Sequence, residues 1–223
     1  MNKQTKTKIN SKKEIIRVID EKNNLVNKEE TRYCIIEEIN PSNYKIVSNS
    51  YMSLKELYND YYVYGLLEVN PEIINDNKAS LYKKKYGILK LNRDDYLRVI
   101  PFSERIIVPP LYDEITAKNS NTVCVKHNQK CTFFDLNKER QLTPVVLDVI
   151  TSFDMEYPGF AQCFYNYKAG YLPRNIKPIT DKNKIDLLSL GEVEALVNYQ
   201  KNTDSFLESN KKYTELTGKS YTK

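Results

Sequence analysis

The sequence predicts an α+β protein that consists mainly of antiparallel β-hairpin repeats with flanking helices, including a helical C-terminal segment. Three observations carry this prediction. Between residues 79 and 175, short alternating segments are separated by polar turn residues, which is typical of strands and hairpins. Two stretches within this region align with each other in order and spacing, which indicates a repeat. After residue 188, apolar residues recur at helical spacing.

Composition places the chain among globular proteins. It has 223 residues, of which 40% are hydrophobic and 28% charged, so it is long enough and apolar enough to bury a core without disulfides. Tyrosine is abundant at 18 residues, whereas tryptophan is absent and glycine is scarce at 6. We therefore expect tyrosine to contribute to core packing and to binding surfaces.

Signals for export and for membrane insertion are missing. The chain has no apolar run of about eighteen residues, and no apolar stretch follows the basic N-terminus. Its four cysteines form no CxxC pair. We therefore expect a cytoplasmic protein with free thiols and no membrane contact.

The positive charge is concentrated at the N-terminus. The formal net charge is +5, and residues 1–13 contain five lysines and no acidic residue, so the rest of the chain is neutral on balance. A fold that binds phosphates should carry its surplus charge in the body. We predict that residues 1–12 form a disordered basic tail.

Residues 13–78 are predicted to form an N-terminal α+β segment. A capping-box pattern at Ser11 and Glu14, followed by Ile15 and Ile16, predicts a helix over residues 12–22. A strand is the alternative for the same residues, because they are rich in β-branched side chains.

Two further elements follow in this segment. The turn residues Asn40-Pro41-Ser42-Asn43 separate two apolar runs and predict a hairpin over residues 32–48. A second capping box at Ser53 and Glu56 predicts a helix over residues 53–61.

The region 79–175 contains the repeat. Residues 122–136 align with residues 160–174 at a separation of 38, and residues 111–115 align with residues 146–150 at a separation of 35. The matched pairs include Val125 with Cys163, Asn128 with Asn166 and Thr132 with Gly170. Residues 79–92 suggest an earlier copy, with Gly87 matched to Thr132. Each copy reads as a hairpin that cannot bury its apolar face alone, so we expect the copies to pack together.

One stretch of this region resembles a known repeat family. Tyr86-Gly87 is followed by the run IVPPLYDEI at residues 107–115, and the pattern resembles the WG (KWG-type) β-repeat family. Tyr86 stands where that family has Trp, and Thr132 and Gly170 occupy the later Trp-Gly positions. The resemblance implies a β-rich scaffold that mediates binding and has no shared catalytic residue.

The candidates for chemistry are few. Cys124, His127 and Cys131, completed by Cys163 or Cys34, are the best zinc candidates, but strand geometry places residues 124 and 127 on opposite faces. His127 is the only histidine, and a glycine-rich phosphate loop is absent. We therefore predict no enzyme activity, no catalytic residue, no metal and no cofactor.

The remaining function class is binding. We expect a non-catalytic binding protein whose partner is another protein, for example an inhibitor or accessory factor in a bacterial, phage or mobile-element conflict system. The alternative is a protein that binds RNA or DNA through the basic tail and residues 82–86. The oligomeric state stays open. The candidate binding residues are Tyr61, Tyr62, Tyr64, Tyr82, Lys83, Lys84, Lys85, Tyr86, Tyr165, Tyr167 and Lys168.

Overall fold

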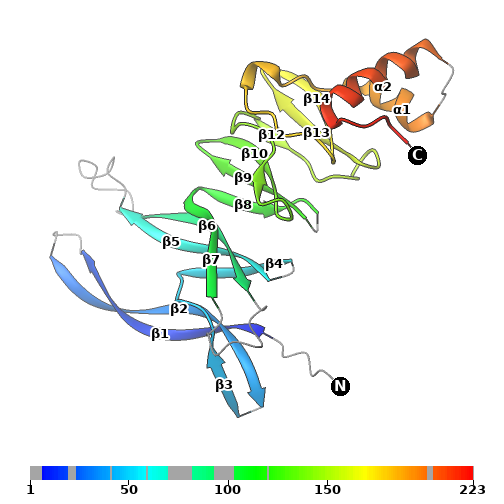
Figure 1. The fold of residues 1–223 in the computed structure, drawn as a ribbon. Helices are drawn as coiled ribbons and strands as arrows, with labels where there is room; N and C mark the ends of the chain where they lie inside the picture. The colour runs from blue at the N-terminus through cyan, green and yellow to red at the C-terminus, as the bar shows by residue number, and fades with distance from the viewer. Residues whose placement is uncertain are drawn as a thin grey trace. The chain divides into compact units, whose positions relative to one another are not determined.

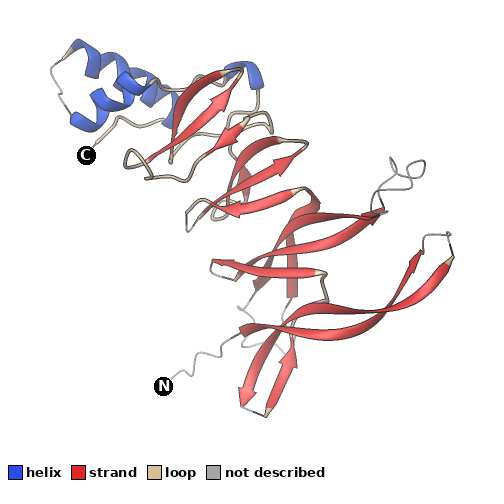
Figure 2. Ribbon diagram, turned by 180° about the vertical axis from the view of Figure 1, so that it is seen from behind, coloured by secondary structure: helices blue, strands red, loops and turns tan. Residues whose placement is uncertain are grey.

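The computed structural model of the chain consists mostly of antiparallel β-strands, followed by α-helices near the C-terminus (Figures 1 and 2). This agrees with the predicted α+β class. The structure describes residues 7–19, 24–40, 42–58, 60–69, 82–92, 103–119, 121–199 and 203–222. The chain divides into two compact units, which we call the N-terminal half (Met1–Tyr112) and the C-terminal half (Asp113–Lys223).

The first sheet of the N-terminal half has the strand order β1-β2-β3, with β1 at Thr7–Ile19, β2 at Leu25–Asn40 and β3 at Asn43–Ile46. Every residue of β1 pairs with a residue of β2, and Figure 1 shows these two strands as a long twisted ribbon. β2 and β3 form a hairpin within the residues for which the turn sequence predicts one.

Strand β1 corrects two predictions. Residues 7–12 belong to this strand and not to a disordered tail, while residues 1–6 lie outside the described residues. The predicted helix over residues 12–22 is also wrong for residues 12–19, where the alternative prediction of a strand is confirmed. Residues 20–22 lie outside the described residues. The physical reason is that β-branched side chains such as Ile15 and Ile16 favour pairing with β2. In this strand Glu14 pairs with Lys12 and accepts a hydrogen bond from Ser50, and it caps no helix.

The second sheet has the order β4-β5-β6-β7, with strands at Ser53–Tyr58, Tyr61–Val69, Tyr82–Asn92 and Ser103–Tyr112. The predicted helix over residues 53–61 is therefore wrong. Asp60 has a φ of 67°, and the chain reverses there so that β5 pairs back onto β4. This partner strand replaces the helical hydrogen bonds that the capping pattern suggested.

The core of the N-terminal half joins both sheets. Ile35 from β2 packs in one cluster with Tyr62 and Tyr64 from β5 and Leu89 from β6, and all four side chains are buried. The ring of Tyr51, in the connection before β4, lies 4.8 Å from that of Tyr64. The two sheets therefore bury a shared face rich in tyrosine.

The C-terminal half contains two further sheets. One has the order β11-β10-β9-β8, with strands at Arg140–Gln141, Lys130–Asp135, Thr122–His127 and Glu114–Ala117. The other has the order β12-β13-β14, with strands at Val149–Ile150, Phe160–Tyr165 and Lys168–Pro173.

The predicted C-terminal helices are present as α1 (Leu190–Asn198) and α2 (Asp204–Thr217). The side chain of Thr203 caps α2 by accepting a hydrogen bond from the N–H of Phe206 at 3.2 Å. Phe160 from β13 lies against Tyr213 of α2, with ring centroids 6.1 Å apart. The helices and the strands β9, β10, β12, β13 and β14 share one apolar core, which includes Phe133, Leu147, Phe160, Leu172, Leu188, Val193, Leu196 and Phe206.

Candidate functional site

Two hairpins in the C-terminal half have the same strand length and the same turn. The pair β9–β10 and the pair β13–β14 each join strands of six residues through two turn residues. The turn residues are Asn128-Gln129 and Asn166-Tyr167, and all four have φ between 48° and 65°. Positive φ at both central residues defines the type I′ turn, which matches the twist of the flanking strands. Tyr167 is therefore held at the tip of a well-formed hairpin.

The strand before each hairpin also pairs in the same register. Ile115 on β8 lies opposite Val125, and Ile150 on β12 lies opposite Cys163. These are the residues that the sequence alignment matches at separations of 35 and 38. We call β8–β10 the first hairpin unit and β12–β14 the second hairpin unit.

A row of three side chains crosses one face of each hairpin unit, because directly opposed residues of antiparallel strands share a face. In the first unit the row consists of Glu114, Lys126 and Cys131. In the second unit the matched positions hold Val149, Phe164 and Ala169, which we call the outer row. Val149 is 51% exposed and Phe164 is 37% exposed. A pair of opposite charges in the first unit is thus replaced by exposed apolar side chains in the second.

A groove of about 530 Å³ borders the outer row at Ala169. It lies along the β13–β14 turn and the segment that leads to α1, and its lining includes Tyr165, Lys168, Lys182, Asp186 and Leu187. The hydroxyl of Tyr165 donates a hydrogen bond to the carbonyl oxygen of Lys182 at 2.9 Å. Tyr167 is fully exposed at the turn, and Lys168 is exposed next to it. Two of the predicted binding residues, Tyr165 and Lys168, therefore line this groove, and Tyr167 lies in the turn between them.

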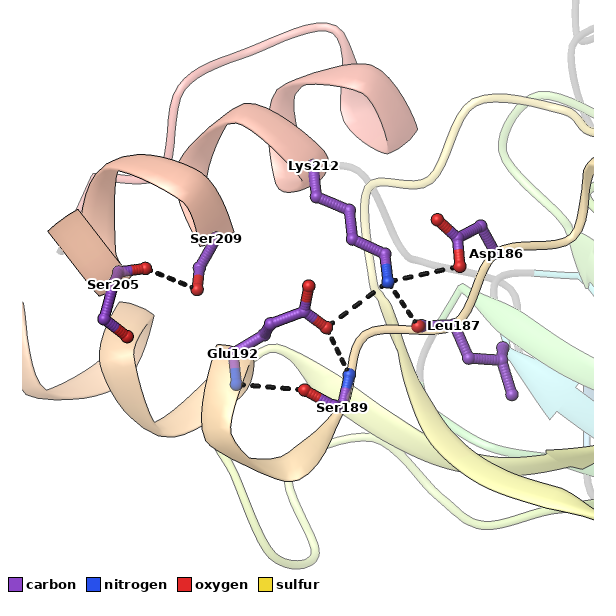
Figure 3. A network of polar contacts seen from close by, with 7 residues as sticks. All are labelled: Asp186, Leu187, Ser189, Glu192, Ser205, Ser209 and Lys212. Carbon is purple, nitrogen blue, oxygen red and sulfur yellow. Dashed lines mark hydrogen bonds and ion pairs between the residues drawn. The ribbon is translucent and has the colours of Figure 1, made fainter.

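Lys212 of α2 fixes one wall of the groove (Figure 3). Its ammonium group donates to the carbonyl oxygen of Leu187 at 2.8 Å and forms ion pairs with Asp186 at 3.1 Å and Glu192 at 3.3 Å. Glu192 also accepts from the N–H of Ser189 at 2.6 Å, and the two residues form the capping box of α1. The residues before α1 are thus tied to both helices.

The electrostatics of this network favour the ionised carboxylate. Burial raises the pKa of Glu192, but the hydrogen bonds from Ser189 and the charge of Lys212 outweigh it, so the pKa lies below its ordinary value.

The prediction that Tyr61, Tyr62 and Tyr64 are exposed anchors is wrong. Each is at most 4% exposed. Strand β5 is an interior strand, Tyr62 and Tyr64 belong to the core between the two sheets, and the ammonium group of Lys90 lies 5.0 Å from the ring centroid of Tyr61. These tyrosines therefore pack within the N-terminal half and offer no exposed ring as an anchor.

The predicted Tyr/Lys stretch lies on β6 of the N-terminal half. Lys83 and Lys84 are exposed, and Tyr86 is half-buried. Lys85 is only 7% exposed, which corrects its assignment to a surface. The side chain of Tyr82 lies outside the described part of the structure. The stretch therefore offers two exposed cations and no exposed aromatic ring among its described side chains.

Cys124 and Cys131 line a smaller cavity of about 190 Å³ in the first hairpin unit. A hydrogen bond with Cys124 lowers the pKa of Cys131; burial opposes this effect, and Lys126 and Lys118 reinforce it. The thiol of Cys131 itself donates to the carbonyl oxygen of Asp148 at 3.9 Å. The hydrogen bond between the two thiols and burial raise the pKa of Cys124. Cys131 is therefore the more acidic thiol of the pair.

The structure also places the other predicted zinc ligands. His127 is three residues from Cys124 on β9, so its side chain starts from the opposite face. Cys163 is buried in the same apolar core as Cys124 and Cys131, and Cys34 is buried within the N-terminal half. Within the described ranges, no three side chains of His, Cys, Asp or Glu are placed to hold a metal ion.

Sequence reasoning missed the outer row. The alignment itself contained the signal, because it sets Phe164 against Lys126 and Val149 against Glu114. An apolar residue at a position that is charged in the matched unit indicates an exposed apolar side chain.

No helix in the described part of the chain is long and apolar enough to cross a membrane. Comparison with known proteins finds no matching family model, no matching curated protein and no matching solved structure.

Proposed function

We propose that this chain is a non-catalytic binding protein that holds a protein partner on the outer row of the second hairpin unit. The observation that carries the proposal is the exposure of Val149 and Phe164 at positions where the first hairpin unit has Glu114 and Lys126. Exposed apolar side chains gathered on one rigid sheet are typical of an interaction surface.

The outer row has the properties of an anchor. Full burial of an apolar side chain such as valine or phenylalanine stabilises a complex by about 1.5–3 kcal/mol. Phe164 and Val149 sit on paired strands, so little conformational freedom is lost when a partner covers them. Tyr167 projects from a type I′ turn beside the row and adds an amphipathic ring.

We also propose that the two hairpin units are copies of one repeat, of the kind that the WG-type resemblance implies. The shared turn type and register support this proposal. The glycine of the second hairpin unit and the matched glycine of the earlier copy at residues 79–92 also share a crowded position, where the first unit has Thr132. A Cβ at Gly87 would lie 2.5 Å from the carbonyl oxygen of Val108, and a Cβ at Gly170 would lie 2.9 Å from that of Leu188. At both glycines the backbone of a later segment, at Val108 or at Leu188, lies so close to the strand that a side chain at the glycine position has no room.

The nucleic-acid alternative has weaker support. Three lysines near the N-terminus form ion pairs with acidic side chains, Lys8 with Glu38, Lys12 with Glu14 and Lys13 with Glu29. Cations that are paired in this way offer less charge to phosphates.

The test is affinity capture from cells of the native host, with the full chain as bait. The test variant carries Val149→Glu and Phe164→Lys together, which copies the Glu114–Lys126 pair of the first unit. The matched control is Leu207→Lys, because Leu207 is also an exposed apolar residue, at 56%, but lies on α2. We expect a protein that is captured by the wild type and the control and lost with the double variant. Equal capture by all three baits, or recovery of nucleic acid alone, would overturn the proposal.

A further inference from the structure

The outer edge of β14 has an open backbone position at Ala169. The N–H of Asp148, next to β12, donates to the carbonyl oxygen of Phe164 at 2.8 Å, so the backbone of Phe164 faces β12. Ala169 lies opposite Phe164 and therefore belongs to a pair that is not hydrogen-bonded, with its own N–H and C=O directed away from β13. Among the described residues, none forms a hydrogen bond with these outward groups of Ala169.

The same edge is occupied two residues further along β14. The N–H of Tyr171 donates to the carbonyl oxygen of Leu188 at 2.8 Å, and the N–H of Leu188 donates back at 3.0 Å. The edge is thus already used for strand-like pairing, and the pairing stops before Ala169.

The first hairpin unit shows what fits at the open position. Cys131, which matches Ala169 in register, exchanges two backbone hydrogen bonds with Leu147, at 2.7 and 3.2 Å. An extended residue therefore fills this edge position in one unit. In the other unit the chain forms a 3₁₀ turn at Lys182–Lys184, and the groove of about 530 Å³ lies along Ala169.

The charges around the groove indicate the chemistry of an occupant. Lys168 and Lys182 line it, and within the described part of the chain neither forms an ion pair. The one acidic side chain in the lining, Asp186, is paired with Lys212 at 3.1 Å. Ala169 and Leu187 supply apolar surface between the cations. An acidic segment complements this groove and a basic one does not.

We infer that the edge of β14 at Ala169 accepts an extended, acidic segment of the protein partner as an added β-strand. This inference rests on the proposed function and specifies which part of the partner is recognised. Backbone hydrogen bonds at Ala169 supply affinity, and alternate side chains supply specificity. The side chain paired with Ala169 lies on the face of Phe164 and continues the outer row, so it should be apolar. The residues before and after it in the added strand point to the opposite face, where Lys168 lies, so they should be acidic.

The probe is a synthetic peptide of about seven residues that alternates valine with glutamate, compared with a peptide that alternates valine with lysine. Binding to the full chain is measured by fluorescence anisotropy at low and at moderate salt. We expect the acidic peptide to bind at least about tenfold more tightly than the basic one, with a preference that weakens as salt rises.

Two substitutions at Ala169 test whether its outward backbone N–H binds the peptide. Ala169→Pro removes the outward N–H and leaves the hydrogen bonds to β13 intact, which an edge strand tolerates. Ala169→Val keeps the N–H and favours the strand. We expect the acidic peptide to lose about tenfold in affinity with Ala169→Pro and to keep its affinity with Ala169→Val. Equal affinity for both peptides, unchanged binding to Ala169→Pro, or an equal loss with Ala169→Val would overturn the inference.

A second variant keeps the test decisive if Ala169→Pro does not fold. Lys168→Glu combined with Lys182→Glu reverses the charge of the groove, and we expect it to prefer the basic peptide. An unchanged preference for the acidic peptide would contradict the inference. The partner captured in the host distinguishes a failure of the proposed function from a failure of the added-strand inference. If its capture needs Val149 and Phe164 but tolerates both Ala169→Pro and the charge reversal, the proposed function stands and the added strand is wrong.

Discussion

Phe164 occupies in the second hairpin unit the position that Lys126 occupies in the first. Lys126 lies opposite Glu114 on one neighbouring strand and Cys131 on the other, and Phe164 lies opposite the matched residues Val149 and Ala169. Lys126 faces a carboxylate at Glu114, whereas Phe164 faces Val149 and both apolar side chains reach solvent. This difference between two otherwise matched sheets is the basis of the proposed binding surface.

The outer row should be dispensable for folding. Val149→Glu combined with Phe164→Lys should change the free energy of unfolding by less than about 1 kcal/mol, because both side chains are exposed and the new pair is of opposite charge. Chemical denaturation of the isolated protein measures this change. A loss of more than about 3 kcal/mol would place the row in the core and remove it as a surface.

The matched glycines Gly87 and Gly170 should tolerate an added side chain poorly. Gly87→Ala and Gly170→Ala should each destabilise the protein by about 1–3 kcal/mol, because the new Cβ would press on the carbonyl oxygens of Val108 and Leu188. Gly191→Ala is the matched control, since a Cβ there meets nothing within 4 Å and Gly191 lies in α1. It should be neutral or stabilise by up to about 1 kcal/mol. Similar losses in all three variants would contradict the crowding argument.

The capping network of α1 should show a defined pH dependence. The folded-state pKa of Glu192 lies below its ordinary value of 4.5, so the ionised carboxylate stabilises the fold. Its contribution is fully present above about pH 4.5 and is lost as the pH falls through the lower, folded-state pKa. The difference in unfolding free energy between wild type and Glu192→Gln should therefore be constant at neutral pH and shrink in acid.

The same measurement needs a carboxylate outside the network as its control. Glu208→Gln on α2 serves this purpose, because Glu208 is exposed. Its difference from wild type should stay near zero at neutral pH. A difference for Glu192→Gln that grows as the pH falls would show that the sign is wrong.

Cys131 should be the more reactive thiol of its pair. Its pKa is lowered by the hydrogen bond with Cys124, while burial raises the pKa of Cys163. Alkylation near neutral pH, followed by mass spectrometry, should label Cys131 before both Cys124 and Cys163. Cys124→Ala removes the hydrogen-bond partner and should slow the labelling of Cys131 severalfold, whereas Cys124→Ser keeps a partner and should slow it less. Equal rates in both variants would rule out the hydrogen bond as the cause.

Local signals in the sequence were sufficient for some of the fold. The turn residues Asn128 and Asn166, flanked by alternating strands, predicted the two hairpins, and the apolar spacing after residue 188 predicted helices. The capping boxes at Ser11 and Ser53 misled the prediction, because a partner strand from elsewhere in the chain supplies more hydrogen bonds and burial than an isolated helix.

Burial was harder to predict than strand position. The sequence places Tyr62 and Tyr64 on a strand, but the face that the other sheet covers depends on tertiary packing. Tyr165 and Lys168 do line one groove, and the exposed Tyr167 lies in the turn between them. The open edge at Ala169 has no signal in the sequence, because it depends on where the chain leaves the sheet before Leu188.

The most direct test of the central claim is the binding of the captured partner to purified variants of this chain, measured by calorimetry at one salt concentration. We expect Val149→Glu combined with Phe164→Lys to weaken the affinity at least about a hundredfold, because burial of both apolar side chains is lost. Leu207→Lys should bind as the wild type does. Undiminished affinity of the double variant, with its fold intact, would contradict the claim that the outer row is the binding surface.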